Sequence, residues 1–93
     1  MKRWRLRDPA SIRWRAWDDG WVFFHSPSGD THLIERPAAE ALVALRDGPS
    51  ATDALARLVE AQVAPEERQD LETALDAFLT RLAELGVVEA LSP

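Results

Sequence analysis

Three segments in the first third of the chain alternate hydrophobic and polar residues with a period of two, which is typical of β-strands. They are "SIRWRAW" (residues 11–17), "WVFFHS" (21–26) and "THLIE" (31–35). The turn signals "DDG" (18–20) and "PSGD" (27–30) separate them, because glycine can adopt the positive φ that tight turns require. The pattern predicts a three-stranded antiparallel meander.

The register between the first two strands follows from the length of the first loop. A three-residue "DDG" loop pairs Trp17 with Trp21 and Trp14 with Phe24. We expect this loop because a two-residue "DG" turn would mix hydrophobic and polar side chains on each face of the sheet. One face then carries Ile12, Trp14, Ala16, Val22, Phe24 and Leu33. The other carries Arg13, Arg15, Trp17, Trp21, Phe23, His25, His32 and Ile34. This second face is aromatic but interrupted by Arg and His, so we expect the N-terminal "RWRL", a dimer mate or a ligand to cover part of it.

The rest of the chain shows the helical period. The first helix begins at Pro37 and ends near Asp47-Gly48. The second follows "SATD" (residues 50–53), which resembles a capping box. The third is the longest: it begins at Pro65 and ends at Gly86, with Val87 placed for a Schellman-type contact. Its apolar face is formed by Leu71, Leu75, Phe78, Leu82 and Leu85.

The order of elements predicts an α+β fold, β-β-β-α-α-α, in which the last two helices form a helix-turn-helix beside the meander. This is a winged helix-turn-helix. Its length of 93 residues predicts a single domain over residues 1–93.

Composition narrows the classes of function. The chain has no cysteine, which excludes disulfides, thiolate metal sites and cysteine nucleophiles. No apolar run is long enough to span a bilayer, and the basic N-terminus lacks the apolar core of a secretory signal. We therefore expect a cytoplasmic protein without a membrane partner.

Charge is divided between the two ends of the chain. Residues 1–15 carry a net charge of +5 and residues 16–93 carry −10. A winged helix that reads DNA would use its third helix, yet residues 65–85 carry −4. Phosphates would repel such a helix, so the charge argues against nucleic acid.

Catalytic chemistry finds little support. His25 and His32 lie near each other across the second turn, but a metal site needs further ligands and Asp30 is the only acid close by. Ser26 and Ser28 belong to the turn, and nothing orients either as a nucleophile. We expect no enzyme, no cofactor and no metal.

Peptide binding remains as an interpretation. The strand at residues 31–35 is the last of the meander, so it is expected at an edge with unpaired backbone groups. It runs directly into a helix, which predicts a groove between the strand and a helix. An extended peptide could add there as a further strand.

The same residues resemble the PqqD-like family of peptide chaperones, or RiPP recognition elements, over about residues 10–90. The likeness rests on "SGDTHLIERPAAEALVALRDGPSATDALARLVE" and "LETALDAFLTRLAELGVV", in which Asp47-Gly48 ends the first helix and Gly86-Val87-Val88 follows the third. The stretch "RWRAWDDGWVFF" resembles the branch that accompanies an HPr-kinase-like protein. One departure is Glu35-Arg36-Pro37, where the family often has Asn before the helix.

The resemblance implies a winged-helix protein whose leader or substrate peptide adds antiparallel to the third strand and is presented to a peptide-modifying enzyme, which could be an HPr-kinase-like protein. The implied strand residues are Thr31, His32, Leu33, Ile34 and Glu35. The implied residues of the third helix are Asp70, Ala74, Ala77, Phe78 and Arg81.

The alternative functions are a homodimer that buries Trp17, Trp21 and Phe23 and, with less support, a DNA-binding regulator.

Overall fold

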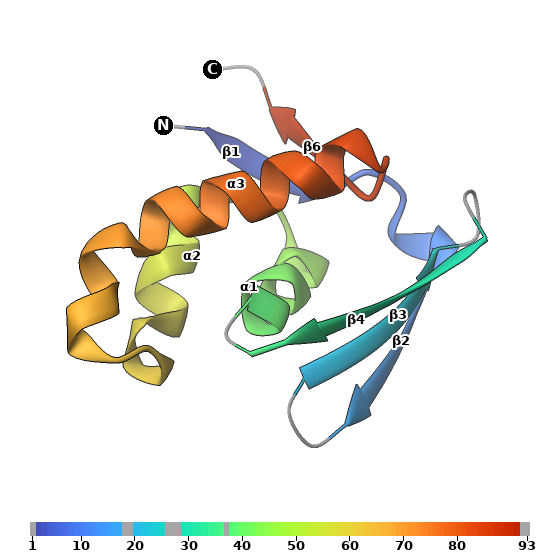
Figure 1. Cartoon of the computed structure of the whole chain (residues 1–93). Helices are drawn as coiled ribbons and strands as arrows, with labels where there is room; N and C mark the ends of the chain where they lie inside the picture. The colour runs from blue at the N-terminus through green and yellow to red at the C-terminus, as the bar shows by residue number, and fades with distance from the viewer. Residues whose placement is uncertain (1, 18–19, 26–28, 37, 92–93) are drawn as a thin grey trace.

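The predicted meander is present in the computed structural model, which describes residues 2–17, 20–25, 29–36 and 38–91. Its strands are β2 (Ile12–Trp17), β3 (Gly20–His25) and β4 (Asp30–Glu35). They pair antiparallel in the order β2-β3-β4, so β4 is an edge strand as predicted. Figure 1 shows this sheet beside three helices.

The helices are α1 (Ala38–Ala44), α2 (Thr52–Val59) and α3 (Leu71–Glu84). Short 3-10 segments extend them at Leu45–Asp47, Glu60–Gln62 and Pro65–Asp70, so the third predicted helix begins as a 3-10 turn. Together with the meander they confirm the α+β order β-β-β-α-α-α.

The helix ends agree with the predictions in one place and differ in another. Gly86 has a φ of +82°, and the Val87 N–H donates to the Leu82 carbonyl, as expected for a Schellman end to α3. The capping box at residues 50–53 was wrong: α2 has Ala51 at its N-cap, with no side-chain hydrogen bond. Pro37 lies outside the described residues.

A second small sheet was not predicted. It contains β1 (Arg3–Leu6), β5 (Ser50–Ala51) and β6 (Val88–Leu91) in the order β5-β1-β6, and a 3-10 turn at Pro9–Ser11 connects β1 to β2. The "RWRL" segment therefore does not cover the meander, because it forms β1 and pairs with strands from distant parts of the chain. Trp4 in β1 is 1% exposed, and its Nε1 donates a 2.8 Å hydrogen bond to Thr52 Oγ1.

The predicted register of the meander was wrong by one residue. Trp17 pairs with Gly20 and Trp14 with Phe23, so only residues 18 and 19, which lie outside the described residues, separate the strands. Because side chains alternate with a period of two, a slip of one residue moves all of β3 to the other face. The inner face, which carries the buried residues, holds Ile12, Trp14, Ala16, Trp21, Phe23, His25, His32 and Ile34. The outer face holds Arg13, Arg15, Trp17, Val22, Phe24, Thr31, Leu33 and Glu35.

The observed register has a clear physical advantage. It places the rings of Trp14, Trp21 and Phe23 together on the inner face, with ring centroids 6.2 Å apart for the two tryptophans and 5.6 Å apart for Trp14 and Phe23. It also keeps Arg13 and Arg15 in water on the outer face. Gly20 permits the close pairing of β3 with β4, since a Cβ at this position would overlap the Ile34 carbonyl oxygen.

The observed register does not form the predicted aromatic interface. Trp17 lies on the outer face and is 38% exposed, whereas Trp21 is half-buried on the inner face and Phe23 is completely buried. These three side chains therefore do not form one surface. His25 and His32, predicted on the same face as Arg13 and Arg15, lie instead on the inner face, opposite to these arginines.

All three helices and both sheets contribute to one hydrophobic cluster. β1 supplies Trp4 and Leu6, and the meander supplies Phe23. The helices add a larger set, which is Ala39, Ala41, Leu42, Leu55, Ala56, Val59, Leu71, Leu75, Leu79 and Leu82. The placement of β4 and α3 is therefore set by a shared core.

The corrected register predicts unequal costs for two aromatic truncations. Phe23→Ala should lower the free energy of unfolding by about 3–5 kcal/mol, because it empties a buried site. Trp17→Ala should cost less than about 1 kcal/mol, since its ring is on the outer face. Urea unfolding measures both, and equal costs would contradict the register.

The Trp4–Thr52 hydrogen bond should stabilise the second sheet. Thr52→Val keeps the shape but leaves the buried Trp4 N–H without its acceptor, so it should lower the free energy of unfolding by about 1–3 kcal/mol. In a Trp4→Phe background the same change should cost less, because the donor is already gone. Equal costs in the two backgrounds would show that the hydrogen bond contributes nothing.

Candidate functional site

The outer edge of β4 offers backbone groups at residues 31–35 that no described strand pairs with. β4 pairs with β3 on one side and with no other described strand. Its side chains alternate: Ile34 is buried on the inner face and His32 is half-buried there, whereas Leu33 is 60% exposed on the outer face. Ile34 therefore faces the helices, and Leu33 does not.

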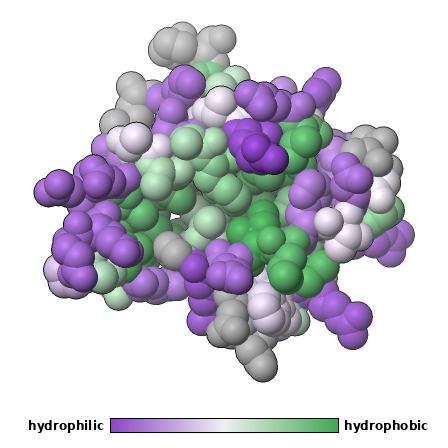
Figure 2. Space-filling view, in the orientation of Figure 1, coloured by the Kyte–Doolittle hydropathy of each residue, from purple (hydrophilic) through white to green (hydrophobic). Residues whose placement is uncertain are grey.

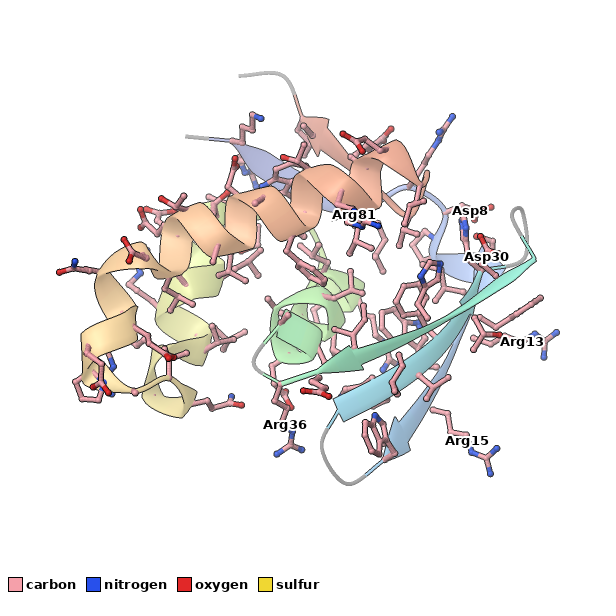
Figure 3. The ribbon with its side chains drawn as sticks, in the orientation of Figure 1. Asp8, Arg13, Arg15, Asp30, Arg36 and Arg81 are labelled. Carbon is pink, nitrogen blue, oxygen red and sulfur yellow. The ribbon has the colours of Figure 1, made fainter. Side chains whose placement is uncertain are left out.

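The predicted helix residues form one stripe. Asp70 is the N-cap of α3, and Ala74, Ala77, Phe78 and Arg81 follow it at spacings of three and four, which places them on one face. Phe78 is half-buried and packs against the core, and the other four are exposed. In Figure 3 the Arg81 side chain extends from α3 toward the meander.

The strand and the stripe border one surface. β4 packs on α1, whereas α3 packs on α2 and β6, so α1 lies between the two elements (Figure 1). Figure 2 shows hydrophobic side chains gathered across the middle of this face, with hydrophilic residues around them. We call this surface the β4–α3 groove, after the groove that the sequence predicts; it is bordered by the edge of β4 and by the stripe of Asp70, Ala74, Ala77, Phe78 and Arg81.

A cavity lies at the N-terminal end of the stripe. It has a volume of about 400 Å³, and Val63, Leu71 and Ala74 line it together with carboxylates and an amide. These polar lining residues are Gln62, Glu66, Glu67 and Asp70. Asp70 and Ala74 belong to both the cavity and the stripe, so the cavity adjoins the stripe.

A second cavity lies at the C-terminal end of α3. Its volume is about 550 Å³, and its lining includes Arg7, Asp8, His25, Glu84 and Gly86. Both signs of charge are present, so this cavity has no uniform electrostatic preference. His25 is buried within it, at 4% exposure.

His32 connects the edge strand with the aromatic core. Its ring stacks on Phe23, with centroids 4.8 Å apart, and its buried Nε2 has no hydrogen-bond partner among the described residues. Among the described residues, no group of three or more His, Cys, Asp or Glu side chains is placed to hold a metal ion. Within the same part of the chain, no helix has the length and apolarity needed to cross a membrane.

Sequence reasoning missed the residues at both ends of the groove. Glu66 and Glu67 precede Asp70 by about one turn, so helical spacing could have found them. Arg7 and His25 could not be found in this way, because pairing of β1 with β6 brings Arg7 to the end of α3.

Two solved structures are similar to this chain over nearly its full length. One is TbiB1 in complex with the TbiA(beta) leader peptide, with a TM-score of 0.76, 19% identity, and coverage of 96% of this chain and 99% of that chain. The other is a lasso peptide synthetase B1 complexed with the leader peptide, with a TM-score of 0.72, 28% identity, and coverage of 92% and 96%. This chain therefore shares the winged-helix fold of these proteins. No family model and no curated protein matches the sequence.

Proposed function

We propose that this protein is a non-catalytic adaptor that captures a leader or substrate peptide by strand addition to β4 and presents it to a peptide-modifying enzyme. The observation that carries the proposal is the outer edge of β4, which pairs with no described strand and lies on the side of the meander nearest α3 (Figure 1). The similar folds of two proteins solved with leader peptides support it.

Strand addition fits the chemistry of the β4–α3 groove. The edge of β4 supplies backbone donors and acceptors at residues 31–35, which give affinity that does not depend on the peptide's sequence. The inward side chains of the peptide would contact the apolar part of the groove, formed by Ala77, Phe78 and Ile34. The outward side chains would remain beside Leu33 in water.

The walls of the groove are suited to binding. They combine small apolar side chains, one phenylalanine and peripheral charges. Such side chains can hold a peptide in place, and none of them needs to act as a catalytic group. The modifying enzyme would then act on the part of the peptide that extends beyond the groove. An HPr-kinase-like protein as that enzyme, and membership of the corresponding branch, stay predictions.

DNA binding is the weaker alternative. α3 and the 3-10 turn before it carry mostly acidic side chains, with a net charge of −4 over residues 65–85. The basic residues Arg13 and Arg15 lie on the outer face of the meander, away from α3 (Figure 3). Phosphate contacts would therefore not come from the helix that reads bases in a winged helix.

Proline substitutions in β4 test the strand-addition proposal. Alternate residues of an edge strand direct their N–H groups to the paired strand and outward, so His32→Pro and Leu33→Pro differ in which bond they remove. The variant that loses the outward N–H should remain folded and bind its peptide about fivefold to tenfold more weakly, since one net hydrogen bond is lost. The peptides encoded beside the gene, titrated against the isotope-labelled protein, provide the measurement.

The controls separate binding from folding. Amide shifts of the free variants show which one keeps the native sheet. In the wild-type protein, peptide-induced shifts should cluster at residues 31–35 and along residues 68–81. Unchanged peptide affinity in both variants, when both are folded, would refute strand addition to β4.

A further inference from the structure

We propose that the β4–α3 groove selects its peptide by the order of charges: a Lys or Arg toward the peptide's N-terminus, apolar residues next, and an Asp or Glu toward its C-terminus. The basic and acidic residues should be about five positions apart. This inference rests on the proposed function and specifies the class of peptide that the groove accepts.

The cavity at the N-terminal end of α3 suits a long basic side chain. Three acidic residues line this cavity: Glu66, Glu67 and Asp70. None of the three has an ion-pair partner among the described residues. Val63 and Leu71 supply apolar surface in the same cavity of about 400 Å³. A Lys or Arg places its methylene stem on apolar surface and keeps its charge at a polar rim, which matches this arrangement.

Arg81 provides the opposite charge further along the stripe. It is exposed, has no ion-pair partner within the described part of the chain, and points toward the meander in Figure 3. A guanidinium binds a carboxylate through two parallel hydrogen bonds, so Arg81 favours Asp or Glu in the peptide. The selectivity should end there, because the cavity beyond it mixes Arg7 with Asp8 and Glu84.

The direction of the peptide follows from the arrangement of β4 and α3. The two elements run in opposite directions in Figure 1, so that the beginning of α3 and the end of β4 lie on the same side of the view. A peptide that pairs antiparallel to β4 therefore runs in the direction of α3. Its N-terminal part lies toward Glu66 and Asp70, and its C-terminal part lies toward Arg81.

The spacing between the two charged residues of the peptide follows from the rise per residue of a helix and of an extended chain. Asp70 and Arg81 are eleven positions apart, which corresponds to about 16 Å along a helix. An extended chain covers this length in about five residues. Because alternate side chains face the same side of a strand, we expect the charged pair at positions i and i+4 or i and i+6.

A selection from displayed random linear peptides tests this inference without knowledge of the natural client. The full-length protein serves as bait, and the selected sequences are aligned on their apolar core. We expect Lys or Arg enriched before the core and Asp or Glu after it. In individual synthetic peptides, replacing the basic residue by Glu should weaken binding about threefold to tenfold at low salt, and less as salt rises.

Matched variants assign the effect to these residues. The double variant Glu66→Lys/Glu67→Lys should remove the preference for a basic residue and select acidic residues at that position. Arg81→Glu should remove the preference for an acidic residue at the second position and select basic residues there. Glu72→Lys is the control, because Glu72 is also an exposed acid near the start of α3 but lines a different cavity, with Lys2 and Thr52; its selected peptides should match those of the wild type.

The outcomes distinguish the two proposals. Selected peptides that shift the β4 amides but show no charge order, or the reverse order, would overturn the inference and leave strand addition intact. Selected peptides that leave the β4 amides unshifted would overturn strand addition itself. Identical selections by the wild type and the Glu66/Glu67 double variant would also exclude the acidic cavity as a source of selectivity.

Discussion

The placement of β1 between β5 and β6 is the constraint on which the other elements depend. β5 leads into α2 and β6 follows α3, so a single strand holds the start of one helix and the end of the other. Backbone hydrogen bonds extend this connection: Thr52 N–H donates to the Lys2 carbonyl at 3.2 Å and Arg7 N–H to the Val87 carbonyl at 3.1 Å. The buried Trp4 fills the space beneath the strand. The direction of α3 is therefore set by the fold itself.

The two faces and the edge of the meander have separate roles. Its inner face carries the aromatic side chains that join the core, and its outer face keeps Arg13 and Arg15 in water. β4 contributes Ile34 to the core, while no described strand pairs with its outer edge. A peptide would thus add to a strand that the core already holds, which reduces the ordering cost of binding.

The groove itself depends on two elements that do not pack closely on each other. α1 supports β4, and α2 and β6 support α3. The family resemblance implied all five residues of the α3 stripe, and they share one face because helical spacing is local and periodic. The cavities at its two ends combine residues from different elements, and Arg7 reaches one of them only through a strand pair that spans most of the chain.

The sequence by itself determined the three strands of the meander, the three helices and the end of α3 at Gly86, because periodicity and glycine chemistry act over a few neighbouring residues. Only the tertiary structure decided the register, since the choice between a two-residue and a three-residue loop depends on which aromatic rings the core accepts. The same holds for β1. Its four residues form a strand because β5 and β6, folded from residues about 45 to 85 positions away, provide the backbone partners that a short isolated segment lacks.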